Sequence, residues 1–296
     1  MEIPVHGVGA MIGGRLILKR LEEVCRLLEK FPFGYTVHAP NPLNLMDREN
    51  AVWHKQALKE CLNFAAAIGS KVLVYHSGRY IPEETFHIPN GRKPLNAKLK
   101  EQMMLQEREA LLELAEVAEE MDVVIAMENA RPYMDASPYC YAEDLFMLVN
   151  QVEIINNPFV GITLDVGHAY LASRYYGFDF LKAVAKAAPF VRHIHLHDNF
   201  GLASGSLEKK QAELMAMGRG DLHLPIGLGE IPISEVSALL DNFHGVVVHE
   251  IRPRYREWAK IALELGRQLL SSRVSIISED SGENSPKIQV ISAKHG

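Results

Sequence analysis

The middle of the chain carries one pattern twice, first as Val123-Val-Ile-Ala-Met-Glu128 and then as Val160-Gly-Ile-Thr-Leu-Asp165. Both runs have the length and the β-branched content of a buried strand, and both end in a carboxylate. Between them, residues 142–155 show the apolar periodicity of a helix. A strand, a helix and a second strand in this order indicate a parallel sheet covered by helices.

The same pattern extends outward in both directions. Towards the N-terminus, runs of strand length end in His38 and His76, and a weaker run covers Glu2–His6; towards the C-terminus, further runs end in His195 and Glu250. Most of these runs are separated by segments with helical periodicity, which cover residues 15–30, 49–68, 95–121, 178–188, 233–240 and 256–270. Ionisable side chains at the end of strand after strand predict an α/β fold, a (β/α)8 TIM barrel whose catalytic face gathers them.

A complete barrel needs eight strands, and the first strong strand here has only the weak Glu2–His6 run before it. We therefore expect a TIM barrel over residues 1–271 that lacks its first strand–helix unit. Residues 272–296 alternate in two short stretches, so they are expected to form a C-terminal extension of short strands or a hairpin. Our hypothesis is that this extension or a partner subunit covers the open barrel edge, because an uncovered edge invites aggregation.

Two further features concern the surface of the barrel. The charge-rich run Glu107–Glu120 is expected on a solvated helix face. Residues 78–94, 131–141 and 200–230 are too long or irregular for simple turns and follow the strands that end in His76, Glu128 and His195. Connections of that length in a compact domain are typical of functional loops.

The composition limits the classes of function. The chain has 296 residues, 48% of them hydrophobic, which suits one large α/β domain. No apolar run reaches membrane-spanning length and the N-terminus has no signal-like segment, so we expect a cytoplasmic protein. The three cysteines are widely spaced and indicate neither disulfides nor a thiolate metal site. A net charge of -6 argues against a nucleic-acid surface, and the partner we expect is a small carbohydrate; a homodimer is plausible.

Glu128, Asp165, His195 and Glu250 form the core of the candidate site, since they end four consecutive strong strands. Carboxylates and imidazole are the ligands that Mn²⁺, Mg²⁺, Co²⁺ or Zn²⁺ accept. Three buried carboxylates without a cation would repel one another, so a bound divalent metal is the simplest interpretation.

Further ligand candidates lie at other strand ends and in one loop. His168 follows Asp165 directly and could bind a second metal, orient substrate or only begin a helix. Asp221 and His223 are two residues apart in an extended segment, which directs both side chains to one side. His38 and His76 could bind metal, contact substrate or only pack.

Candidate substrate contacts come from His168 and from three other residues. Alternation places His193, His195 and His197 on one face, with His193 deeper in the barrel and His197 at its rim. Arg79 and Arg252 follow strand ends and could hold an anionic substrate group, although surface arginine is the commoner outcome.

Several short motifs, taken together, resemble the xylose isomerase-like TIM-barrel superfamily. They are His38-Ala-Pro40, Met127-Glu-Asn129, Leu164-Asp-Val-Gly-His168, His195-Leu-His-Asp198, Asp221-Leu-His223 with Gly227-Leu-Gly-Glu230, and His249-Glu250. The similarity covers roughly Glu2 to Arg254. This superfamily includes sugar and sugar-phosphate isomerases and epimerases, and also the endonuclease IV group of apurinic-site nucleases.

The resemblance implies different sites in the two branches. In an isomerase or epimerase, Glu128, Asp165, His195 and Glu250 would hold one divalent ion that acts as a Lewis acid on the substrate. Glu128 and Glu250 would move the proton on and off carbon. In the endonuclease IV branch the same four residues would be joined by five others to hold three zinc ions for phosphodiester hydrolysis, namely His38, His76, His168, Asp221 and His223.

Three departures favour the first branch. We expect the chain to lack the first strand–helix unit, whose loop the nucleases use to grip DNA, and Asn41 stands where those nucleases place an aromatic wedge. The loops show no basic, aromatic-interleaved strip. The resulting prediction is a metal-dependent isomerase or epimerase of a sugar, polyol or sugar phosphate, with a multi-zinc phosphodiesterase as the alternative.

Overall fold

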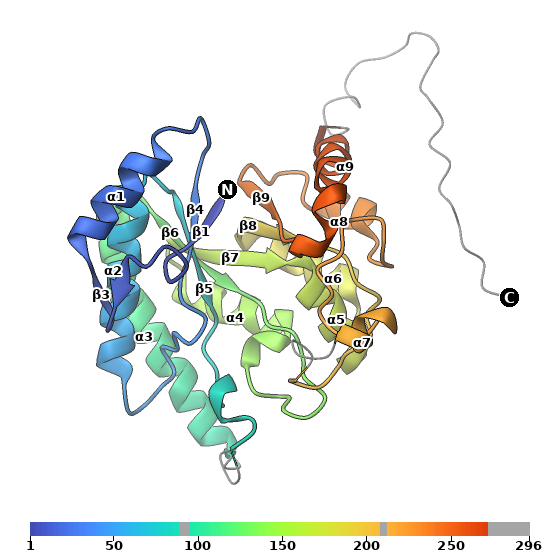
Figure 1. The fold of residues 1–296 in the computed structure, drawn as a ribbon. Helices are drawn as coiled ribbons and strands as arrows, with labels where there is room; N and C mark the ends of the chain where they lie inside the picture. Colours follow the sequence, from blue (N-terminus) through green and yellow to red (C-terminus); the bar gives the residue numbers. More distant parts are fainter. Residues whose placement is uncertain (89–94, 208–211, 272–296) are drawn as a thin grey trace, which may run out of the picture.

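Seven parallel strands form the centre of the molecule. The computed structural model describes residues 1–88, 95–207 and 212–271. The strands are β1 (Glu2–Pro4), β4 (Thr36–His38), β5 (Val72–His76), β6 (Val124–Glu128), β7 (Val160–Asp165), β8 (Val191–Leu196) and β9 (Val246–His249), and they lie side by side in that order. They curve into a nearly closed barrel with helices on its outside (Figure 1), which confirms the predicted α/β TIM-barrel fold.

The helices occupy the segments where the periodicity placed them, with two additions. They are α1 (Leu18–Leu28), α2 (Ala51–Ala67), α3 (Ala97–Met121), α4 (Leu145–Ile155), α5 (Val166–Tyr176), α6 (Phe180–Ala187), α7 (Ala212–Ala216), α8 (Ile233–Leu239) and α9 (Ala259–Ser271). The short α7 and the longer α5 were not predicted. In addition, Met11–Ile12 and Arg15–Leu16 form a small hairpin, β2–β3, because Gly13 and Gly14 adopt the positive φ angles of its turn.

The apolar runs are buried because helices pack against the outside of the barrel while polar side chains fill part of its inside. Leu73, Ile125 and Ile162 are fully buried and belong to one continuous core. The alternate residues Val72, Val74 and Ala126 form a second, small buried cluster, so the strands also carry apolar residues on their other face and the runs are nearly continuous.

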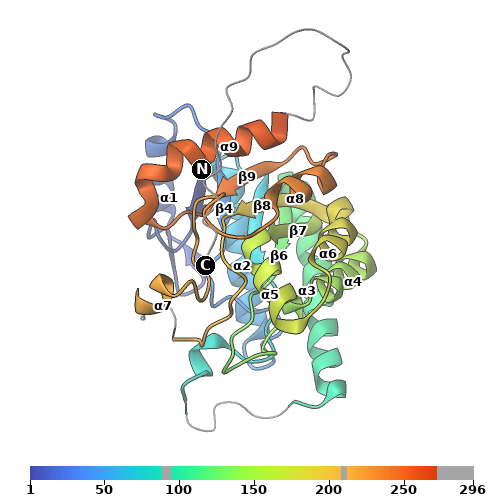
Figure 2. The same ribbon diagram turned by 90° about the vertical axis from the view of Figure 1, so that its right-hand side faces the viewer.

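The barrel is one strand short of eight within the described residues. The weak Glu2–His6 run forms β1, so a strand–helix unit, β1 and α1, precedes the strand that ends in His38. The free edges of the sheet are β1 and β9, and the gap in the barrel lies between them. That the missing unit is the first one stays a prediction, because this gap lies equally before β1 and after β9. α9 lies beside β9 (Figure 2), and its Leu263 lines the same cleft as Met1. The predicted extension over residues 272–296, including its proposed covering of the edge, falls outside the described residues.

The charge-rich run Glu107–Glu120 was predicted on a solvated face, and Glu109, Glu113, Glu116, Glu119 and Glu120 are indeed exposed. The prediction was wrong for the first residue of the run. Glu107 does not lie on a solvated face: it is fully buried and accepts hydrogen bonds from the Tyr141 hydroxyl (2.6 Å), the Tyr75 hydroxyl (3.1 Å) and the Gly78 amide (2.6 Å). These three donors come from segments far away in sequence, so the charge run alone could not reveal them.

Membrane-spanning length and apolar character are not combined in any of the described helices.

Candidate metal centre

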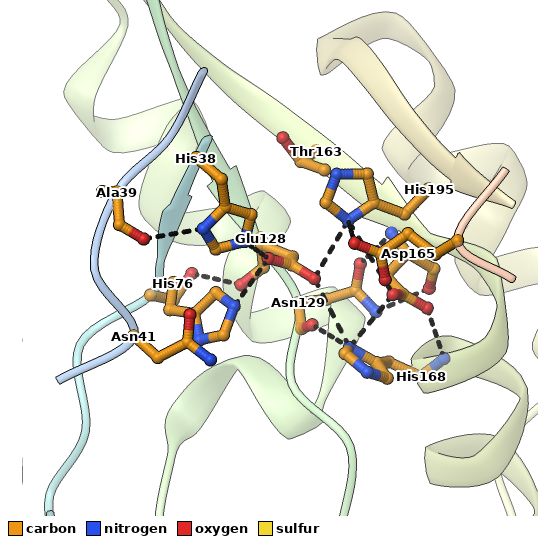
Figure 3. A network of polar contacts seen from close by, with 12 residues as sticks. His38, Ala39, Asn41, His76, Glu128, Asn129, Thr163, Asp165, His168 and His195 are labelled. Carbon is orange, nitrogen blue, oxygen red and sulfur yellow. Dashed lines mark hydrogen bonds and ion pairs between the residues drawn. The ribbon is translucent and has the colours of Figure 1, made fainter. Parts of the chain in front are cut away.

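Polar side chains gather where the parallel strands end at the same edge of the barrel. His38 ends β4, His76 ends β5, Glu128 ends β6 and Asp165 ends β7, while His195 lies one residue before the end of β8 (Figure 3). Glu250 follows β9 directly. The strand register explains this convergence, because His76 pairs with Glu128 and Asp165 pairs with His195 across neighbouring strands.

Three of the four core residues approach one nitrogen of the fourth. The Nδ1 atom of His195 lies 3.3 Å from Glu128 Oε1, 3.5 Å from Glu250 Oε1 and 4.0 Å from Asp165 Oδ2. His195 and Asp165 are fully buried and Glu128 is nearly so, while the Glu250 side chain keeps 26% of its surface exposed. Asp165, His195 and Glu250 offer donor atoms that all lie within 4.8 Å of one another, and so do Glu128, Asp165 and His168. Carboxylate oxygens and imidazole nitrogens gathered in this way are donors of the kind that divalent cations bind.

The electrostatics of these groups show how strongly the site attracts positive charge. Burial alone would raise the pKa of Glu128, but His76 and His195 outweigh burial and hold that pKa well below its usual range. Burial alone would lower the pKa of His195, but Glu250 and Glu128 raise it well above its usual value. Carboxylates that favour a proton on a buried histidine would equally favour a metal cation in its place. The residues present therefore fit a divalent metal ion.

Asp165 also explains the unpredicted helix α5. It ends β7 and is at the same time the N-cap of α5, where its Oδ1 accepts a hydrogen bond from the His168 amide at 2.7 Å. The strand and the helix thus share one residue without a loop between them, so the sequence shows no turn signal there. This arrangement places His168 in the first turn of α5, with Nδ1 3.4 Å from Asp165 Oδ2.

His38 and His76 approach the other oxygen of Glu128. Their Nε2 atoms lie 3.4 Å and 3.0 Å from Glu128 Oε2, and the two rings meet edge to face (Figure 3). Glu128 is thus shared by two neighbouring groups of predicted ligands, with His195 at Oε1 and with His38 and His76 at Oε2.

Asp221 and His223 lie on the far side of His168, together with an arginine that the sequence reasoning missed. His223 Nε2 is 2.8 Å and His168 Nε2 is 3.4 Å from Asp221 Oδ2. The Nη1 atom of Arg131 lies 3.1 Å from the same Asp221 oxygen and 3.1 Å from His168 Nε2. The Arg131 guanidinium therefore already neutralises Asp221. In the sequence, the feature nearest to Arg131 that pointed to the site was the Glu128-Asn129 pair, which ends two residues before it.

The structure places His197 inside the protein rather than at the rim. It is fully buried, its Nε2 lies 3.1 Å from Asp165 Oδ1, and its ring stacks on His223 with centroids 4.2 Å apart. The His197 ring therefore contacts Asp165 from inside the protein.

The two arginines that were candidates for substrate contact also bind protein groups. Arg79 is buried and donates to the carbonyls of Asn41 and Leu43 and to Glu83. Arg252 donates from Nη2 to the Asp221 carbonyl at 2.7 Å, yet it also lines the cleft.

Glu2 is a second residue that the sequence reasoning did not include. Its Oε2 lies 2.9 Å from His193 Nε2 and its Oε1 lies 3.0 Å from His195 Nε2. Burial alone would raise the pKa of Glu2, but His195 and His193 hold it far below its usual range. The weak strand signal of Glu2–His6 hid this residue, although alternation along β1 directs it into the barrel.

The site opens into a cleft of about 860 Å³. Glu128, His168, Glu250 and Arg131 form part of its wall, and Met1 and Val248 on the two sheet edges form another part. A cleft of this size accommodates a small organic molecule.

Comparisons with known proteins agree with this fold. A family model described as "Xylose isomerase-like TIM barrel" matches residues 1–269. No curated protein sequence gave a significant match.

Solved structures with the same fold include a D-tagatose 3-epimerase-like protein, with a TM-score of 0.66 and 23% identity over 87% of this chain and 85% of that one. A D-psicose 3-epimerase solved with D-fructose has a TM-score of 0.63 and 14% identity over 91% and 88% of the two chains. The IOLI protein with a bound zinc atom has a TM-score of 0.60 and 18% identity over 86% and 81%. At these identities the structures support a common fold.

Proposed function

Because the chain belongs to the xylose isomerase-like TIM barrel family, we propose that it is a divalent-metal-dependent isomerase or epimerase of a sugar, polyol or sugar phosphate. The observation that carries the proposal is the convergence of Glu128, Asp165 and Glu250 on His195 Nδ1, at the wall of a cleft of about 860 Å³. The site thus combines a cation-binding donor set with room for a small substrate.

In this proposal Glu128, Asp165, His195 and Glu250 hold one divalent ion. When bound, the ion supplies Lewis-acid polarisation of substrate oxygen atoms.

Two glutamates carry the proton transfer that an isomerase or epimerase needs. Glu250 is the more exposed of the two and lines the cleft, so its carboxylate is the group that we assign to removing a proton from substrate carbon. Glu128 is nearly buried and surrounded by His38, His76 and His195, which favours a fixed position for returning or holding a proton.

The substrate class follows from the cleft and from the related folds. His168, Arg131 and Arg252 offer hydrogen-bond donors in or beside the cleft wall, which suits hydroxyl groups or a phosphate. Arg79 and His197 are buried and bound to protein groups, so we assign them to ordering the site. Structures of epimerases of D-tagatose and D-psicose type share the fold, which makes these ketoses the first compounds to test.

Hydrolysis by several zinc ions is less compatible with the arrangement around Asp221. In the multi-ion reading, His168, Asp221 and His223 would share an ion. The Arg131 guanidinium, 3.1 Å from both Asp221 Oδ2 and His168 Nε2, brings a fixed positive charge to that position instead. Like charges so close would disfavour a further cation.

The proposal is tested by metal analysis followed by proton exchange. Protein purified without chelator or nickel is analysed for metal, then loaded with Mn²⁺ or Co²⁺ and incubated in D₂O with D-tagatose, D-psicose, D-fructose and sugar phosphates. Deuterium incorporation at carbon with formation of the epimer or isomer supports the proposal, and Glu250→Gln should abolish both. Two or three zinc ions per chain with cleavage of abasic DNA, and no exchange in any compound, would overturn it.

A further inference from the structure

Glu2 lies below the proposed metal ligands, on the first strand of the barrel. β1 pairs in parallel with β4, in the register Glu2 with Thr36 and Pro4 with His38. His38 reaches the metal centre, so Glu2 lies one inward-facing position deeper. Its side chain is only 9% exposed.

The Glu2 carboxylate is shared among three groups. Oε2 accepts a hydrogen bond from Thr36 Oγ1 at 3.0 Å and lies 2.9 Å from His193 Nε2. Oε1 lies 3.0 Å from His195 Nε2, in an ion pair rather than a well-aligned hydrogen bond. The Glu2 carboxylate therefore lies beside Nε2 of His195, whereas the three other carboxylates lie near Nδ1.

The two nitrogens of His195 thus face different partners. Nδ1 lies 3.3 to 4.0 Å from Glu128, Glu250 and Asp165, whereas Nε2 lies beside Glu2. An imidazole that binds a metal through Nδ1 carries its proton on Nε2, and an acceptor there fixes both the tautomer and the ring orientation.

We propose that Glu2 is a positioning residue that holds His195 in the Nε2-protonated form, with Nδ1 directed at the metal. The inference rests on the proposed function, because it assumes that His195 is a metal ligand. It goes further because it assigns a role to Glu2, a residue outside the ligand set, on strand β1, which supplies no metal ligand itself. Outer partners of this kind typically change metal affinity by about 10–100-fold when they are removed.

The test compares three variants of the full-length protein. Glu2→Gln keeps the side-chain volume and an acceptor oxygen but removes the charge, and Glu2→Ala removes the partner entirely. Thr36→Val is the matched control, because it deletes another buried hydrogen bond to the same carboxylate without touching His195. Affinities for Co²⁺ and Zn²⁺ are measured by competition with a chromophoric chelator, and the visible absorption of bound Co²⁺ reports the ligand geometry. Thermal unfolding of each metal-free variant separates loss of stability from loss of metal.

We expect Glu2→Ala to weaken metal binding by about 10–100-fold and to change the Co²⁺ spectrum, with Glu2→Gln between it and the wild type. Thr36→Val should lower stability without altering the affinity or the spectrum. If Glu2→Gln and Glu2→Ala bind Co²⁺ like the wild type, or if Thr36→Val loses affinity as they do, the positioning role is wrong while the proposed function stands. If the wild type binds neither ion, the proposed function and this inference both fail. Should Glu2→Ala not fold, Glu2→Gln against Thr36→Val still decides between these outcomes.

Discussion

Replacing Gly167 by alanine should destabilise the protein through the ring of His197. Gly167 lies in the first turn of α5, between Asp165 and His168. A Cβ atom there would lie 2.0 Å from His197 Cε1 and 2.5 Å from Nδ1. The ring has little room to move, because it is fully buried, stacks on His223 and contacts Asp165 through Nε2.

Two effects of opposite sign decide how much Gly167→Ala changes the free energy of unfolding. Exchanging glycine for alanine inside a helix ordinarily stabilises it by about 1 kcal/mol. Forcing an extra methyl group into a packed interior costs about 1–3 kcal/mol, and a separation of 2.0 Å to a rigid ring belongs to the upper part of that range. We therefore expect a net loss of about 1–2 kcal/mol, which corresponds to a decrease in Tm of roughly 2–8 °C for a protein of this size.

Urea and thermal denaturation of the metal-free protein measure this effect, with Gly34→Ala as the control. Gly34 is exposed, has no positive φ, and a Cβ there would meet no atom within 4 Å. Its replacement should be neutral or stabilising by about 0.4–1 kcal/mol. A Gly167→Ala protein as stable as Gly34→Ala would show that His197 is not held as the structure has it. Metal affinity should also decrease in Gly167→Ala, because His197 orients Asp165.

Three other changes test separate parts of the site. Glu250→Gln should abolish turnover and leave the thermal unfolding curve nearly unchanged, and an active variant would contradict the proton-transfer role. His76→Ala should keep one bound ion and lose at most about 10–100-fold in activity, since its contact is with Glu128; loss of an ion by metal analysis would instead indicate a multi-ion site. Burial raises the pKa of Glu107, so the folded protein holds that proton more tightly than the unfolded chain does. The stability that this proton contributes is complete below about pH 4.5 and is lost as the pH rises through the folded pKa of Glu107. The free energy of unfolding should therefore decrease less between these two pH values in Glu107→Gln than in the wild type.

The buried hydrogen bonds of Glu107 illustrate why side-chain partners escape sequence reasoning. Its helix α3 was predicted from periodicity, but Tyr75, Gly78 and Tyr141, which bond to its carboxylate, lie about 30 residues away on either side. Arg131 is a similar case, because its partner Asp221 is 90 positions further along the chain. Periodicity reports whether a position faces the core, and it carries no information about which distant group meets it there.

The parallel barrel and the gathering of Glu128, Asp165 and His195 at one edge were determined by the sequence alone. Strand length, alternation with helices and the position of each ionisable residue at a strand end are local properties, and parallel pairing brings such ends together. Only the tertiary structure decided which nitrogen of His195 faces the carboxylates and that Glu2 lies against the other one. That choice depends on the register between β1 and its neighbours and on ring orientation in a packed interior, which arise from contacts between segments nearly 200 residues apart.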